Sequence, residues 1–332
     1  MAEPYRILSI DGGGIKGLIP AVLLERLEAA VGRPVAECFD LIAGTSTGGI
    51  LAVALARAGQ DGRPLWSAAE LIELYETEGP RIFDRSVFKA LESAFGIEDE
   101  KYPRENLERA LDHYLGDAML SEALTDLLIA AYETEQRFPF FFKRRRARED
   151  SAHDFPIRDV AYATSAAPTY FEPLKLETPD TVEYFSLVDG GVFASNPAMC
   201  AFAEARRHYP DREVMLVSLG TGELTRSLPY DEVRGWGLRE WIWPHTPILS
   251  VMFDGMSDAV DYQLNQVLRD GFYFRFQPKL DLAKDDMDDA SPENLRALKL
   301  QATTLLADRE EAARFERMCE LLAEGAGDAQ GS

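Results

Sequence analysis

YRILSIDGGGIKG (residues 5–17) and FDLIAGTSTGG (residues 39–49) are the two stretches that decide the fold. In each, a short apolar run typical of a buried β-strand enters a glycine-rich turn that opens a helix. The first turn offers a row of backbone N–H groups, and the second places Ser46 at a sharp corner. A nucleophile and a site that stabilises an oxyanion are the two parts that an acyl-transferring enzyme needs.

Strand and helix patterns alternate outward from these stretches, which favours an α/β protein with a parallel sheet covered by helices. Residues 60–120 instead show helical spacing without clear strands, including a helix at 81–95, and indicate a helical insertion over the sheet. Beyond residue 222 comes a looser region that holds three of the four tryptophans. The other expected helices are 18–31, 49–57, 157–165 and 197–208, and the expected strands are 5–10, 39–43, 127–132, 138–142, 184–188, 213–219 and 272–276.

The C-terminal part begins with an acidic loop at 281–289, followed by Ser291 and Pro292. This pair is a favourable N-cap and first-turn combination, so we expect one closing helix at about 293–322. No linker between independent domains is recognisable. We therefore expect a catalytic domain at 5–276 with a helical cap insertion at 60–120, a C-terminal loop and helix at 277–325 packed on the same domain, and a disordered tail at 326–332.

Composition limits the classes of function. The net charge of −22 opposes binding to nucleic acid and to strongly anionic membranes. No apolar run approaches the roughly 20 residues of a membrane span, and the N-terminus lacks a signal-peptide pattern. The scattered Cys38, Cys200 and Cys319 indicate neither a disulfide framework nor a zinc site. We expect a cytoplasmic protein.

The glycine loop has several interpretations. Gly12, Gly14 and Gly17 match the dinucleotide-binding spacing, but the acidic residue expected at the end of the second strand to hold a ribose is missing. A phosphate-binding Walker loop is disfavoured because Leu18 and Ile19 stand where Lys and Ser or Thr are required. The glycines could also serve tight strand–helix packing alone. In the remaining interpretation, the N–H groups of residues 12–14 form a nest for an oxyanion.

The serine lies in a strand–turn–helix pattern. Gly44-Thr45-Ser46-Thr47-Gly48 matches G-x-S-x-G, in which the glycines relieve crowding around an exposed nucleophile. The start of the following helix favours negative charge that develops at Ser46.

Asp189 is the strongest candidate for the base. It ends an apolar strand and enters a glycine turn, Gly190-Gly191. A desolvated carboxylate can act as a base when it is hydrogen-bonded to the nucleophile and the oxyanion is well stabilised. Alternatively, Asp189 is a turn residue that bonds its own backbone. None of the four histidines stands in a context typical of a catalytic triad: His113, His153, His208 and His245.

With these three motifs the chain resembles the patatin-like phospholipases, whose pattern combines a D-G-G-G-x-R/K-G loop, a G-x-S-x-G elbow and a D-G-G/A aspartate. The similarity extends to residues 163–171, Asn196-Pro197 and residues 217–222, and covers roughly residues 5–276. It implies a three-layer α/β/α fold with a mostly parallel sheet, and a Ser46–Asp189 dyad that needs no metal or cofactor.

The resemblance also implies an oxyanion hole formed by the N–H groups of Gly12, Gly13 and Gly14, with Thr47 as a further contributor. Gly44, Gly48 and Gly190 would support the turns. Lys16 stands where many members carry Arg; it could add positive potential or pair with a carboxylate.

The activity implied is a lipid acyl hydrolase of the phospholipase A or lysophospholipase type, acting on membrane phospholipid or another acyl lipid with peripheral membrane contact. An esterase, thioesterase or acyltransferase for small soluble substrates remains open, as does a non-enzymatic nucleotide-binding module. Residues 137–148 and 236–243, rich in aromatic or basic side chains, are candidate membrane contacts, with core burial as the alternative. The acidic run at 285–289 lacks EF-hand spacing and indicates no calcium site.

Overall fold

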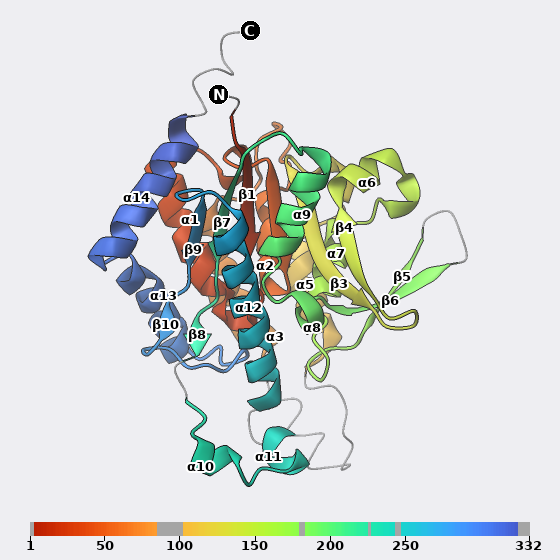
Figure 1. Ribbon diagram of the computed structural model, residues 1–332. Coiled ribbons are helices and arrows are strands. Elements are labelled where there is room, and N and C mark those ends of the chain that lie inside the picture. The colour runs from red at the N-terminus through yellow and green to blue at the C-terminus, as the bar shows by residue number, and fades with distance from the viewer. Residues whose placement is uncertain (1–2, 85–101, 179–182, 225–226, 243–246, 325–332) are drawn as a thin grey trace.

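The computed structural model describes residues 3–84, 102–178, 183–224, 227–242 and 247–324. Within these ranges eight strands form one sheet in the order β5-β6-β3-β2-β1-β7-β9, with β4 also paired to β3 (Figure 1). A separate two-stranded sheet joins β8 (Glu223–Leu224) to β10 (Lys279–Leu280). The large sheet contains β1 (Tyr5–Ile10), β2 (Leu41–Thr45), β3 (Asp126–Glu133), β4 (Phe138–Lys143), β5 (Leu174–Glu177), β6 (Tyr184–Asp189), β7 (Val214–Leu219) and β9 (Tyr273–Phe276).

The centre of the sheet is parallel. β1 pairs in parallel with β2 and β7, and the parallel pairing continues from β2 to β3 and from β7 to β9. Antiparallel pairing is confined to the side that contains β3, β4, β5 and β6. The expectation of a mostly parallel central sheet is confirmed.

Side chains of the central strands supply two apolar cores because successive residues of a strand point to opposite faces. On β1, Leu8 and Ile10 belong to one buried cluster and Ile7 to the other. All three are fully buried, which explains why a parallel strand shows continuous rather than alternating hydrophobicity. The two cores make the fold a three-layer α/β/α arrangement.

Helices cover both faces of the sheet. One layer contains α1 (Leu18–Val31), α2 (Thr47–Leu55) and α7 (Ile157–Ser165), together with α3 (Ala68–Ile82) and α5 (Arg104–Leu115) from the segment expected as a helical insertion. On the other face α9 (Ala198–His208) packs on β1, β2 and β7 and contacts α12 (Pro247–Val267); both helices lie in front of the sheet in Figure 1. The remaining helices are α6 (Arg144–Glu149), α8 (Gly191–Ala194), α10 (Tyr230–Val233), α11 (Leu238–Ile242), α13 (Pro292–Leu305) and α14 (Arg309–Glu324).

The closing helix is divided, and the expectation of one helix at 293–322 is wrong. Ser291 caps α13 as expected, since its hydroxyl accepts the N–H of Asn294 at 3.3 Å. The helix ends at Leu305, and Asp308 then accepts the N–H groups of Glu310 and Glu311 at 2.9 and 3.1 Å. Asp308 therefore acts as a second N-cap that restarts the chain as α14.

Further elements were missed, including the short helices α6 and α8. β5 was not expected, and the region beyond residue 222 contains the 21-residue helix α12 where looser structure was expected. The helix expected at 81–95 falls largely outside the described residues, as do Trp243 and the tail. In the part of the chain that the structure describes, no helix combines the length and hydrophobicity needed to cross a bilayer.

Candidate active site

Ser46 occupies a strained corner between β2 and α2. Its backbone has φ 56° and ψ −127°, in a region that non-glycine residues rarely adopt. The flanking glycines permit this turn: a Cβ atom on Gly44 would lie 2.3 Å from the Gly48 carbonyl oxygen, and one on Gly48 would lie 2.2 Å from that of Ile10. The elbow is thus packed directly against β1, at the N-terminus of α2.

Asp189 reaches Ser46 because two strands meet end to end along the same edge of β3. β2 ends with Thr45 paired to Ala130, and β6 ends with Asp189 paired to the next residue, Ala131. The Asp189 carboxylate is buried at 5% exposure and lies close enough to the Ser46 hydroxyl for that group to lower its pKa. The two predicted catalytic residues therefore lie together, although 143 positions separate them in the sequence.

The environment of Asp189 tunes its acidity. Burial raises the pKa of Asp189 to about 7, against the opposing effects of the nearby Ser46 hydroxyl and of the hydrogen bond from the Gly191 N–H. The Gly191 N–H donates to Asp189 Oδ1 at 2.7 Å and so fixes one carboxylate oxygen. A base whose pKa lies near neutral pH is matched to removing a proton from a hydroxyl.

The glycine loop lies beside the serine, since a Cβ atom on Gly12 would lie 3.3 Å from Ser46 Cβ. One expectation for this loop is corrected: the Gly12 N–H donates to the Ser195 carbonyl oxygen at 2.9 Å and is not free to hold an oxyanion. No acceptor for the N–H groups of Gly13 and Gly14 is found within the described ranges. These two groups remain as candidate donors.

Contacts on both sides fix the loop. Ile15 donates its N–H to the Met287 carbonyl oxygen at 2.9 Å, and Thr221 Oγ1 donates to the Gly12 carbonyl oxygen at 2.6 Å. Gly14 has φ +60°, and a Cβ atom there would lie 2.2 Å from the Met287 carbonyl oxygen, so both conformation and space require glycine.

Unlike the two glycines, Thr47 has a side chain whose hydrogen bonding must be considered apart from that of its backbone N–H. Its Oγ1 is hydrogen-bonded to the buried Tyr75 hydroxyl at 2.5 Å, so the side chain is engaged in the core. Its backbone N–H belongs to the first turn of α2, where N–H groups have no partner within the helix. Only this N–H can serve an oxyanion.

Lys16 is buried beneath the loop at 4% exposure. Burial lowers its pKa, and the nearby carboxylates of Asp285, Asp254 and Asp286 oppose that shift. The acidic loop and α12 thus place negative charge around this buried cation.

A buried ion pair, which was not predicted from the sequence, supports the glycine loop. Arg275 Nη2 contacts Asp11 Oδ2 at 2.6 Å, and the guanidinium also donates to the hydroxyls of Ser218 and Ser257 at 2.8 and 3.1 Å. Burial raises the pKa of Asp11, and Arg275 counteracts that shift. The pair fixes the residue that directly precedes the three glycines.

Thr164 positions the serine and was also not singled out. Its hydroxyl accepts the Ser46 N–H at 2.9 Å and donates to the Ala130 carbonyl oxygen at 2.6 Å. The hydroxyl therefore joins the elbow to β3, the strand that also pairs with the end of β6. The only signal in the sequence was its position within ATSAAPTYF, residues 163–171.

Replacing Thr164 by Val is expected to lower kcat about tenfold to hundredfold, because the buried Ser46 N–H would lose its acceptor and the elbow would shift; leaving such a group unpaired costs roughly 1–3 kcal/mol. Steady-state kinetics on a soluble ester measures the effect. Thr164→Ser is the matched control because it keeps the hydroxyl, and it should retain most of the activity. Equal losses in both variants would contradict the positioning role.

The described histidines lie elsewhere. His153 pairs with Asp150, His208 contacts Glu204, and the ring of His113 packs edge-on against Tyr114. His245 lies outside the described residues. Across the described ranges no group of three or more His, Cys, Asp and Glu side chains is arranged to hold a metal ion.

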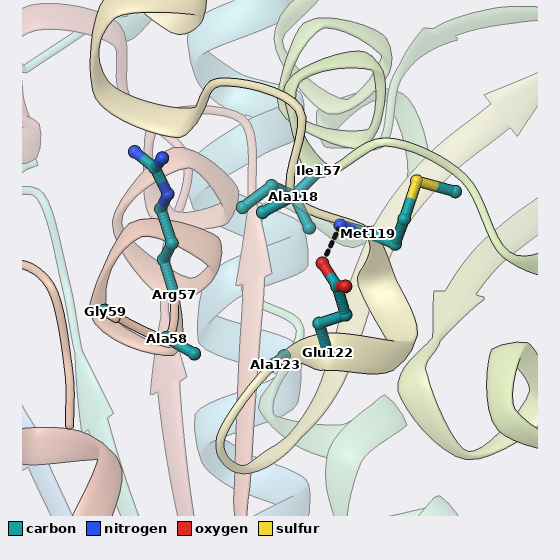
Figure 2. Close-up of a pocket in the computed structure, with 8 residues that line it drawn as sticks. All are labelled: Arg57, Ala58, Gly59, Ala118, Met119, Glu122, Ala123 and Ile157. Carbon is teal, nitrogen blue, oxygen red and sulfur yellow. Dashed lines mark hydrogen bonds between the residues drawn. The ribbon is translucent and has the colours of Figure 1, made fainter. Parts of the chain in front are cut away.

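A cavity of about 270 Å³ lies at the opposite end of α2 from Ser46 (Figure 2). Figure 2 shows Arg57 on one wall and Glu122 on another, with the Glu122 carboxylate accepting the Met119 N–H at 2.8 Å. Ser46, Asp189 and the glycine loop are not among its lining residues, so this cavity is separate from the candidate active site.

Comparison with known proteins places these features in a family. Residues 8–202 match the family model described as patatin-like phospholipase, a range that contains both Ser46 and Asp189. The crystal structure of VipD from Legionella pneumophila is similar over 97% of this chain and 67% of its own, with a TM-score of 0.40 and 12% identity.

Curated relatives match over most of their length. Patatin-like protein 2 of Arabidopsis thaliana is 34% identical over 335 residues, which covers 90% of this chain and 82% of the relative. Patatin-like protein 4 of the same plant is 32% identical, with 88% and 81% covered. The chain belongs to the patatin-like phospholipase family.

Proposed function

We propose that the protein is a lipid acyl hydrolase of the phospholipase A or lysophospholipase type that works through an acyl-serine intermediate. The observation that carries this proposal is the proximity of Ser46 to the buried Asp189, which follows from the register of β2 and β6 on β3, beside a glycine loop whose Gly13 and Gly14 N–H groups have no acceptor in the described ranges. It combines a nucleophile, a base of suitable pKa and unpaired donors in one place.

The first half of the reaction forms the intermediate. Ser46 Oγ attacks the ester carbonyl carbon and passes its proton to Asp189. The N–H groups of Gly13, Gly14 and Thr47 stabilise the tetrahedral oxyanion, a contribution for which one donor is typically worth about 10²–10³ in rate. The C–O bond to the leaving alcohol then breaks, and Asp189 returns the proton to that alcohol.

The second half releases the acid. A water molecule gives a proton to Asp189 and attacks the acyl-Ser46 carbonyl through the same oxyanion site. The bond to Ser46 Oγ breaks, and Asp189 returns the proton to that oxygen. A fatty acid is released, and the Ser46–Asp189 pair is regenerated.

A fluorophosphonate probe tests the nucleophile. We expect covalent labelling of the unmodified protein at Ser46 and no labelling of Ser46→Ala. Fatty acid release from phosphatidylcholine vesicles, compared with hydrolysis of short p-nitrophenyl esters, then separates a lipid hydrolase from an esterase of small soluble substrates. Labelling that persists in Ser46→Ala would reject the mechanism, and turnover of the short esters alone would favour the second activity.

Activity should depend on pH through Asp189. The base works when ionised, so its pKa of about 7 predicts that kcat/KM rises with pH and levels off above neutrality. Below about pH 6 the rate should fall close to tenfold per pH unit, since the ionised fraction falls by that factor. A profile of kcat/KM on a non-ionising soluble ester measures this. A flat profile down to pH 5 would contradict the assignment of Asp189 as base.

A further inference from the structure

The outward face of α12 is apolar at its N-terminal end. Ile248, Val251 and Met252 are 42%, 47% and 49% exposed, and the spacing of these residues places them on one face of the helix. Tyr262, 68% exposed, lies two to three turns further along the same face. Adjacent large apolar side chains in water are unfavourable and commonly mark an interaction site.

The inward side of the same helix carries polar contacts as well as Leu264, which is fully buried in the core. Ser257 accepts a hydrogen bond from Arg275, Asp261 accepts one from the Tyr273 hydroxyl at 2.8 Å, and Asp254 acts electrostatically on Lys16. A surface helix ordinarily turns its apolar face to the core and its polar face to water. In its first half α12 departs from this arrangement, because Ile248, Val251 and Met252 face water while Asp254 and Ser257 make inward contacts.

The inward side of α12 adjoins the candidate active site. The ring of Phe253 lies 4.0 Å from the position of a Cβ atom on Gly191, the residue that donates to Asp189. α11 packs against α12, and Trp236 and Trp241 contact each other edge to face at 5.1 Å. Figure 1 shows α10 and α11 beside the N-terminal end of α12, projecting from the same side of the molecule. Tyr230 of α10 is 75% exposed.

We propose that Ile248, Val251 and Met252, flanked by the aromatic residues of α10 and α11, form the surface that rests on a lipid interface with zwitterionic headgroups. This inference rests on the proposed function, because the helix that would rest on lipid also contacts, through Phe253, the turn that follows Asp189. Tyr and Trp are suited to the headgroup layer at the border of such a surface.

The charged residues around this surface favour one class of lipid headgroup. Apart from the inward Asp254 and Asp261, four acidic residues stand against two arginines across residues 230–262: Asp231, Glu232, Glu240 and Asp258 against Arg234 and Arg239. An acidic border repels anionic headgroups and tolerates neutral ones. Phosphatidylcholine is therefore favoured over phosphatidylglycerol.

The basic segment 137–148 is a weaker candidate for this contact. Lys143 pairs with Glu204 at 2.6 Å and Arg144 with Asp126 at 3.2 Å, so these charges are already compensated. Phe140 and Phe142 are buried in the core.

Vesicle binding tests the surface in a Ser46→Ala background, in which substrate is not consumed. Val251→Glu/Met252→Glu is expected to weaken binding to phosphatidylcholine vesicles at least about tenfold, because two apolar side chains would no longer transfer into lipid. Leu300→Glu on α13, a residue 55% exposed, is the matched control and should bind as the parent does. With Ser46 intact, all three proteins should hydrolyse a monomeric short-chain ester within about twofold of one another if the site is unaffected. Quenching of tryptophan fluorescence by brominated phosphatidylcholine provides a test that needs no change in α12.

Several results would overturn the proposal. The first is a parent protein that neither binds phosphatidylcholine vesicles nor is quenched by the brominated lipid. The second is equal vesicle binding by the parent and the α12 variant. The third is a loss of vesicle binding in the Leu300 control as large as that in the α12 variant. A change of oligomeric mass in the α12 variant without loss of vesicle binding would instead assign the face to a second copy. Vesicle binding that depends on α12 in a protein without hydrolytic activity would support the surface and reject the proposed function.

Discussion

Asp189→Asn is expected to lower kcat by a factor on the order of 10³–10⁴ while the protein remains folded. The amide is isosteric with the carboxylate: its oxygen can still accept the Gly191 N–H, and its NH₂ group can face Ser46 Oγ. It cannot accept the serine proton, so the acyl-serine step loses its base. Kinetics on a soluble ester, with fluorophosphonate labelling as a second readout, measure the loss.

Thermal unfolding of the same variant separates chemistry from folding. Asp189 binds its proton more tightly in the folded protein than in the unfolded chain, so its contribution to stability falls as pH rises from about 4 to about 7. Asn does not ionise, so the variant avoids this loss of stability at high pH. The melting temperature of the variant at pH 8 should therefore equal or exceed that of the parent. Asp117→Asn, at a side chain 91% exposed, is the control and should change neither kcat nor the melting temperature. Residual turnover near the parent level would show that another group is the base.

Arg275→Met is expected to destabilise the protein by about 3–5 kcal/mol, the typical result of leaving one member of a buried ion pair uncompensated. Asp11 would remain buried beside the glycine loop, and Ser218 and Ser257 would lose a donor. With an unfolding entropy of about 2.1 cal/mol/K per residue, this corresponds to a fall in melting temperature of roughly 4–7 °C. The fall should be larger at pH 8 than at pH 5, since a protonated Asp11 tolerates burial better.

The matched control for this change lies close by in the chain. Arg269 pairs with Glu213 at 2.9 Å, but both side chains are about half exposed, so Arg269→Met should cost no more than about 1 kcal/mol. Asp11→Asn combined with Arg275→Met should recover part of the stability, because the uncompensated charge is then absent. Equal effects of the two Arg→Met changes would show that the buried pair has no special role.

Local patterns in the sequence were sufficient for the elements that carry the chemistry. β1, β2 and the helices after them are dictated by apolar runs, glycine turns and helical spacing within about fifteen residues. The elbow at Ser46 and the glycine requirement at Gly14 are of the same kind, since both depend on backbone conformation at the residue itself. Fold class and family motifs could therefore be predicted from local sequence alone.

Elements whose signals are weak or misleading could not be predicted in this way. α12 was missed because Ile248, Val251 and Met252 face outward at its N-terminal end while Ser257 makes an inward polar contact, which obscures the amphipathic pattern that the buried Leu264 would otherwise indicate. The division between α13 and α14 depends on the single cap at Asp308, whose signal was present in the sequence as Asp followed by Glu at 310 and 311.

By itself the sequence determined which residues are chemically able to act: the serine on its strained corner, an aspartate at a strand end and a run of glycines. Only the tertiary structure decided which of them meet. The register of β2 and β6 on β3 brings Ser46 to Asp189, Thr164 contacts Ser46 across 118 positions, and Arg275 reaches Asp11 across 264. The same packing engages the Gly12 N–H with Ser195 and leaves Gly13 and Gly14 as donors. The physical reason is that backbone preference acts over a few residues, whereas hydrogen-bond partners and burial are set by strand order and register between distant segments.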